Sequence, residues 1–189
     1  MRIVIAIAMI SALTSSQIER AQQLARSRDQ ERAAFHRRYL FKPAASDTVT
    51  EIAVVTEFRR LVIITEQHLL VGDQMFSRGE RQAREALAPK RGLISLKAQL
   101  RFHPQNAYTT VPAFKLAVGL VAGGPWSERD TTITGEFGIG QHNRPQTITG
   151  AVLEADVPTA GVGQTTLPVG VVLDGKDIAR ILVDFARLD

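Results

Sequence analysis

Cysteine is absent from this 189-residue chain. Its absence excludes disulfide bonds, zinc sites held by thiolates, iron–sulfur clusters and cysteine nucleophiles. Aromatic residues are also few, at 6%, and Trp126 is the one tryptophan. A flat aromatic platform for binding sugars therefore has little support, although Trp126 follows a Gly-Pro turn and is a candidate binding residue.

Three motifs that would identify an enzyme are missing as well. The sequence contains no Gly-x-Ser-x-Gly nucleophile elbow, no Gly-x4-Gly-Lys-Ser/Thr phosphate loop and no His-Glu-x-x-His zinc motif. The four histidines are isolated from one another along the chain: His36, His68, His103 and His142. We therefore expect no cofactor, no metal and no catalytic residue that the sequence alone can name.

The composition that is present is that of a globular protein. Hydrophobic residues make up 44% of the chain and charged residues 22%, which excludes a disordered chain or a coiled coil. The length allows one domain or two small ones with a real core. Residues 1–91 hold 15 Lys or Arg against 10 Asp or Glu, so the positive charge lies in the first half.

Residues 1–16 predict a signal peptide. A positive start at Arg2 precedes an apolar run from Ile3 to Leu13 that only Ser11 interrupts, and small residues follow. The run is too short to span a bilayer. We expect cleavage near Ser16/Gln17, a periplasmic or secreted protein, and no transmembrane segment in the mature chain. The alternative is a buried first strand from Arg2 to Ile10.

Residues 17–47 predict an Arg-rich helix followed by a linker. The segment up to Leu40 has no Pro or Gly and is rich in good helix formers. Arg37 and Arg38 lie side by side near its end and are candidate contacts for an anionic surface. A solvated helix face is the simpler interpretation of the same residues.

Residues 48–91 predict a helical segment. Apolar residues recur at intervals of three and four from Phe58 onward, and Gly72 and Gly79 predict breaks. Val49 to Val55 is β-branched and suits either a strand or a helix start. Arg59 and Arg60 are further candidate binding residues.

Residues 92–189 predict an antiparallel β-sandwich. Apolar residues alternate with polar ones from Ile94 to Phe102, which gives one buried and one exposed face. Asp174-Gly175 predicts a two-residue hairpin, since both positions tolerate positive φ. The number of short strands and turns favours an immunoglobulin-like sandwich. The predicted fold class is α+β, with an N-terminal helical segment before the sandwich.

The leading functional hypothesis is an exported, non-enzymatic binding or assembly module. Its expected partner is another protein or an anionic surface. One alternative is a hydrolase or metal-dependent enzyme with a site between the helical part and the sandwich, lined by several of His68, His103, His142, Glu154 and Asp156. A second alternative is a binder of anionic glycan, lipid or nucleic acid that uses Arg37, Arg38, Arg59, Arg60, Arg78, Arg81 and Arg84.

Overall fold

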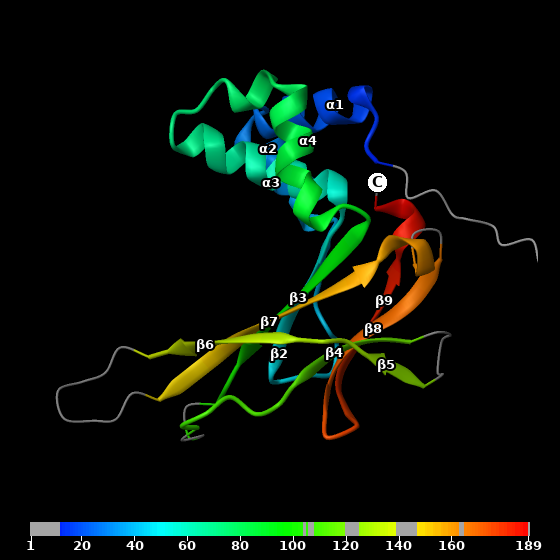
Figure 1. Ribbon diagram of the computed structural model, residues 1–189. Helices are drawn as coiled ribbons and strands as arrows, with labels where there is room; N and C mark the ends of the chain where they lie inside the picture. Colours follow the sequence, from blue (N-terminus) through cyan, green and yellow to red (C-terminus); the bar gives the residue numbers. More distant parts are fainter. Residues whose placement is uncertain are drawn as a thin grey trace, which may run out of the picture.

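A computed structural model shows four helices gathered at one end of two antiparallel sheets (Figure 1). It describes residues 12–103, 105, 108–119, 125–138, 147–162 and 165–188. The mixture of helices and antiparallel sheets confirms the predicted α+β class. Most of the predicted signal peptide, residues 1–11, lies outside the described residues.

The first helix, α1 (Ser15–Ala25), begins at a capping box. The Thr14 hydroxyl accepts a hydrogen bond from the backbone N–H of Gln17, and the Gln17 side chain accepts one from the backbone N–H of Thr14. These bonds satisfy two donors that a helix start leaves without partners. Leu13, just before the cap, is buried in the core.

The other helices complete a small bundle in which α1 packs against α3. A break at residues 26–28 separates α1 from α2 (Asp29–Arg37), so the predicted Arg-rich helix is two helices. The helix α3 (Glu57–Leu70) ends before Gly72, whose φ is +81°, and α4 (Glu80–Leu87) begins after Gly79. Both glycines therefore mark breaks where the sequence predicts them.

The five-stranded sheet has the order β1-β2-β3-β7-β6. Its strands are β1 (Leu40–Phe41), β2 (Val49–Val55), β3 (Leu93–Arg101), β7 (Ile148–Pro158) and β6 (Thr132–Phe137). Helices α3 and α4 lie between β2 and β3 in the chain. The segment predicted as helical therefore also holds a strand, because the β-branched run at 49–55 finds a partner in β3.

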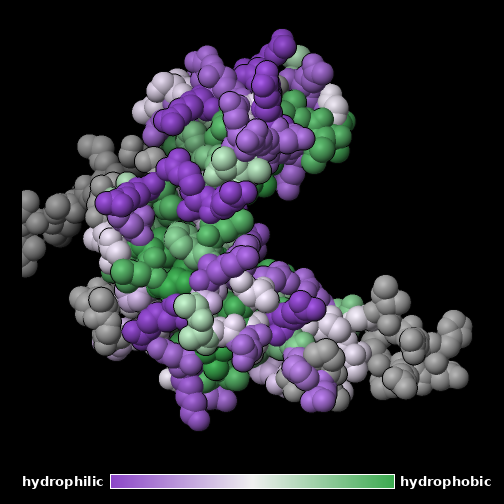
Figure 2. Space-filling view, turned by 180° about the vertical axis from the view of Figure 1, so that it is seen from behind, coloured by the Kyte–Doolittle hydropathy of each residue, from purple (hydrophilic) through white to green (hydrophobic). Residues whose placement is uncertain are grey.

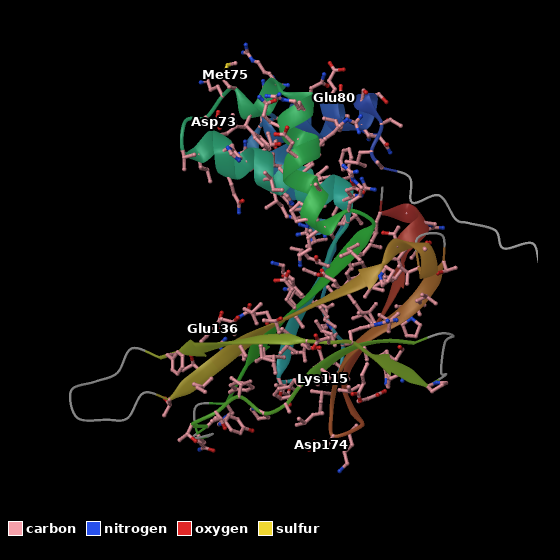
Figure 3. The ribbon with its side chains drawn as sticks, viewed as in Figure 1. Asp73, Met75, Glu80, Lys115, Glu136 and Asp174 are labelled. Atoms are coloured by element: carbon pink, nitrogen blue, oxygen red, sulfur yellow. The ribbon has the colours of Figure 1, made fainter. Side chains whose placement is uncertain are left out.

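The four-stranded sheet has the order β5-β4-β8-β9. Its strands are β5 (Trp126–Glu128), β4 (Lys115–Gly119), β8 (Thr166–Leu173) and β9 (Lys176–Asp184). Asp174 and Gly175 have φ of 50° and 74° and connect Leu173 to its partner Lys176. The predicted hairpin is therefore confirmed, and Figure 3 shows Asp174 at its tip, away from the helices.

One hydrophobic core runs from the helices into both sheets. Ile18 and Leu61 supply it from the helical end, Leu96 and Leu153 from the five-stranded sheet, and Val169 from the other sheet. On one side the surface is notched between the helical end and the sheets (Figure 2). The buried alternation along β3 fixes which face of that sheet meets the core.

Candidate functional site

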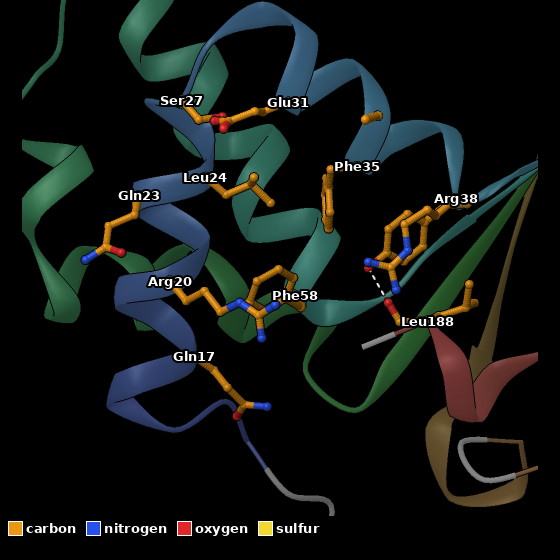
Figure 4. A pocket seen from close by; sticks show the side chains of 12 residues that line it. Gln17, Arg20, Gln23, Leu24, Ser27, Glu31, Phe35, Arg38, Phe58 and Leu188 are labelled. Carbon is orange, nitrogen blue, oxygen red and sulfur yellow. Dashed lines mark hydrogen bonds between the residues drawn. The ribbon is translucent and has the colours of Figure 1, made fainter.

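A hollow with a volume of about 720 Å³ lies at the helical end (Figure 4). It is formed by one face of α1, one face of α2, the first turn of α3 and Leu188 near the C-terminus. Ligand sites in proteins are usually clefts of roughly 300 to 1,000 Å³. This pocket, which we call the helical pocket, is large enough for a small organic molecule.

Three apolar side chains form part of the wall of the helical pocket. Leu24 comes from α1, Phe35 from α2 and Phe58 from α3. The ring of Phe35 meets Tyr39 and Phe58 edge to face, with centroids 5.0 and 5.9 Å apart. This packing holds the aromatic rings in fixed orientations, so the apolar wall does not need to be assembled when a ligand arrives.

Two arginines stand at one end of the pocket. Figure 4 shows Arg20 of α1 and Arg38, just after α2, reaching toward the region beside Phe58 and Leu188. The Arg20 guanidinium carbon lies 5.9 Å from the centroid of the Phe58 ring, and Arg38 Nη2 donates to the carbonyl oxygen of Arg187 at 3.2 Å. Neither arginine forms an ion pair with a residue that the structure describes.

The opposite end of the pocket carries Ser27 and Glu31 (Figure 4). The Ser27 hydroxyl oxygen is buried and has no hydrogen-bond partner among the described residues. Such a group is costly to leave unpaired. The pocket is therefore positive at one end, apolar along its wall, and able to accept a hydrogen bond at the other end.

The five residues selected from the sequence are not brought together. Arg37 is exposed and lies outside the helical pocket, whereas its neighbour Arg38 lines it. Arg59 is buried, with 6% of its surface exposed. Its Nη1 donates to the carbonyl oxygen of Val54 at 2.7 Å, and its guanidinium lies over the Tyr39 ring. Burial lowers the pKa of Arg59.

Arg60 also makes internal contacts, at the junction of helices and sheet. It donates to the carbonyl oxygens of Lys90 and Leu93 at 3.0 and 3.2 Å and to the Ser95 hydroxyl at 2.9 Å. Burial lowers the pKa of Arg60. Arg59 and Arg60 therefore tie α3 to the strands that flank it, and their hydrogen-bonding edges face protein.

Trp126 lies on the four-stranded sheet, far from the other four residues in the sequence, and begins β5 where the sequence suggests a loop. Its indole N–H donates to the carboxylate of Asp177, and the Arg180 guanidinium carbon lies 4.4 Å from the ring centroid. The ring also packs against Gly170. Because Arg180 covers the ring, it is not presented as a bare stacking platform.

The residues of the enzyme alternative are spread over the molecule. His68 lies at the end of α3, where Nδ1 is 2.9 Å from Asp73 and the ring stacks on Phe76. His103 is exposed and follows the end of β3, and His142 lies outside the described residues. Among the described residues, no group of three or more His, Asp or Glu could hold a metal ion.

Glu154 and Asp156 share one face of β7 and bind lysines. Lys90 Nζ lies 2.8 Å from Asp156 and 3.3 Å from Glu154, and Ser95 donates to Asp156 at 2.7 Å. Burial alone would raise the pKa of Asp156, but the bonds from Lys90 and Ser95 outweigh it and hold that pKa below its usual range. The bond to Asp156 raises the pKa of Lys90. Lys90 and Ser95 therefore both serve Asp156 as hydrogen-bond donors.

Comparison with known proteins finds no match: no protein-family model, curated protein or solved structure is significantly similar to this chain. Within the described ranges, no helix combines the length and apolar character needed to cross a bilayer. The site must therefore be interpreted from its own geometry.

Sequence reasoning found Arg38 but missed the pocket around it. Arg20 and Leu24 are four residues apart on α1 and so lie on one helix face. That spacing was available in the sequence. The approach of Leu188, which comes from the far end of the chain, was not.

Proposed function

We propose that this protein is a non-enzymatic binding module that holds a small, partly apolar molecule in the helical pocket. The observation that carries the proposal is the apolar wall of Leu24, Phe35 and Phe58 with Arg20 and Arg38 at one end. The wall supplies the hydrophobic contribution to binding and the arginines set the orientation. For a molecule of about a dozen heavy atoms, micromolar to millimolar affinity is expected.

A neutral fluorescent probe, N-phenyl-1-naphthylamine, tests the pocket directly. We expect its emission to rise on binding to the native chain. Ala34 lines the pocket and is exposed on α2, so Ala34→Phe fills the hollow without disturbing the core. The variant should weaken probe binding at least tenfold while its thermal melt stays unchanged.

The neighbouring residue provides a matched control. Ala33 is exposed on the same helix but does not line the helical pocket. Ala33→Phe should bind the probe as the native chain does. Equal probe binding by Ala34→Phe and Ala33→Phe would overturn the proposal.

Export is part of this proposal, and its support is the charged start and apolar run of residues 1–16. N-terminal mass spectrometry of the natural protein tests it. Cleavage near Ser16/Gln17 would remove Thr14, the residue that caps α1. A mature chain that keeps Met1 would contradict export by a cleaved signal.

We also propose that the two sheets form a sandwich of the immunoglobulin-like type. Support comes from the turn spacing and from inward side chains of both sheets that share one core. The five-stranded sheet includes β1 and β2, which precede helices α3 and α4 in the chain. A sandwich of this type would therefore contain a helical insertion between two neighbouring strands. An experimental structure tests this grouping by its strand connections.

A further inference from the structure

We infer that the helical pocket selects an organic anion with a single charged head, namely a monocarboxylate with an apolar chain. The inference rests on the proposed function, because it names the class of molecule that the same pocket binds. It depends on how charge is distributed along the pocket, from the Arg20 and Arg38 end to the Glu31 end.

The head is recognised by Arg20 and Arg38. A guanidinium group offers two parallel N–H donors that match the two oxygens of a carboxylate. Arg38 uses Nη2 to reach the carbonyl oxygen of Arg187, which fixes the side chain and leaves its other donors for a ligand. Arg20 is held against the Phe58 ring. Both arginines are exposed, and both border the apolar side chains of the pocket.

Two other arginines at the helical end already have carboxylate partners. Arg32 pairs with Asp29 and Glu66, and Arg84 pairs with Glu80. Arg20 and Arg38 have no such carboxylate among the described residues, so an acid that enters the pocket would supply it. A ligand without charge would leave this end unused.

The other end of the pocket disfavours a second anion. Glu31 carries a negative charge there, and like charges at close range repel. A chain with a carboxylate at each end would place one of them beside Glu31. The pocket should therefore prefer a monocarboxylate over the matching dicarboxylate.

Isothermal titration calorimetry of the full chain at pH 7 tests the inference with three probes of equal chain length: decanoate, decanol and decanedioate. Decanoate should bind at least tenfold more tightly than decanol. The affinity for decanoate should fall as salt is raised, whereas the affinity for decanol should not. Decanedioate should bind at least threefold more weakly than decanoate. Glu31→Gln should reduce the difference in affinity between decanoate and decanedioate.

Three charge variants separate the head group from the pocket. Arg20→Gln and Arg38→Gln should each weaken decanoate binding at least fivefold, and should weaken decanol binding by a much smaller factor. Arg37→Gln is the matched control, because Arg37 is the exposed neighbour that lies outside the pocket. It should bind decanoate as the native chain does.

The outcomes distinguish this inference from the proposed function. If the neutral probe binds, Ala34→Phe blocks it, and decanoate is no better than decanol, the binding function stands and the inference on the ligand class is wrong. Equal effects of Arg37→Gln and Arg38→Gln would also overturn the inference. If neither the neutral probe nor decanoate binds, both fail.

Discussion

On the four-stranded sheet, Arg180 lies over Trp126 and pairs with Asp177, whereas at the helical end Arg20 and Arg38 face a hollow with no described carboxylate beside them. On the four-stranded sheet, the contacts among Trp126, Asp177 and Arg180 join β5 to β9. At the helical end, Arg20 and Arg38 have no described ion-pair partner and lie next to apolar side chains. The difference locates the candidate site: binding chemistry lies where cations are positioned by the fold but not neutralised by it.

The exposed apolar side chains are divided in a similar way. Leu70, Val71 and Met75 lie together around the end of α3, while Phe137 and Leu182 lie on separate sheets. Figure 3 shows Met75 and Asp73 at this outer tip of the helical end, and Figure 2 shows hydrophobic surface on the same part of the molecule. The helical end therefore exposes more large apolar side chains close together than the sheets do.

The largest expected effect comes from Arg59, which joins the two regions. Arg59→Ala removes donors to the Val54 and Tyr39 carbonyl oxygens and the contact with the Tyr39 ring. We expect a loss of about 2–3 kcal/mol in the free energy of unfolding, measured with urea. Arg37→Ala is the control and should change it by less than about 0.5 kcal/mol. Similar values for the two variants would show that Arg59 is not a structural tie.

A smaller effect is expected inside the four-stranded sheet, at Gly170. A Cβ there would lie 2.5 Å from the carbonyl oxygen of Ala179 and 2.8 Å from the Trp126 ring. Gly170→Ala should cost about 2 kcal/mol and shift the emission of the one tryptophan toward longer wavelength. Probe binding in the helical pocket should not change. A lost probe signal in folded Gly170→Ala would break the separation between the two regions.

The cap of α1 is expected to contribute about 1 kcal/mol. Thr14→Ala removes the hydroxyl that accepts from Gln17, and urea unfolding should show a loss of that size. Glu19→Ala, on the exposed face of the same helix, should stay within about 0.5 kcal/mol of the native chain. A chain that begins at Gln17 should lose more than Thr14→Ala, since it also lacks the buried Leu13.

The smallest effect concerns pH and the Lys90–Asp156 pair at the junction. Because the folded chain lowers the pKa of Asp156, the pair stabilises the fold above about pH 4, and this contribution is lost as the pH falls through the folded pKa. Both side chains are partly exposed, so Lys90→Gln should cost less than about 1 kcal/mol at pH 6.

The same substitution should reduce the stability that the chain loses between pH 5 and pH 3, because Asp156 no longer gains from a cation. Urea unfolding at several pH values measures this. Lys115→Gln is the control, since Lys115 forms no ion pair with a described residue. If the free energy of unfolding of Lys90→Gln depends on pH as that of the native chain does, the pair does not control the loss of stability in acid.

Prediction from the sequence succeeds here where structure follows from neighbouring residues. The strand around Ile94–Phe102, the Asp174-Gly175 hairpin and the breaks at Gly72 and Gly79 all follow from alternation or from the backbone freedom of short segments. The choice between strand and helix at 49–55 was open, because β-branched residues suit a sheet only when a partner strand is present.

Prediction of the site was weaker for the same reason. Arg37 and Arg38 look equivalent in the sequence and both are exposed, but only Arg38 lines the pocket. Arg59 looks like a surface arginine, and α3 turns it toward the Val54 carbonyl oxygen. His68 and Asp73 are too far apart to share a helix face, yet they meet because α3 has ended between them.

The sequence by itself determined the α+β class and the absence of thiol chemistry, since these depend on composition and on periodicities of two and of 3.6 residues. Only the tertiary structure decided which arginines bond to other parts of the fold and which line the pocket, where a ligand can reach them. Arg20, Arg38 and Leu188 are brought together by packing between segments about 150 residues apart, and no local pattern encodes that approach.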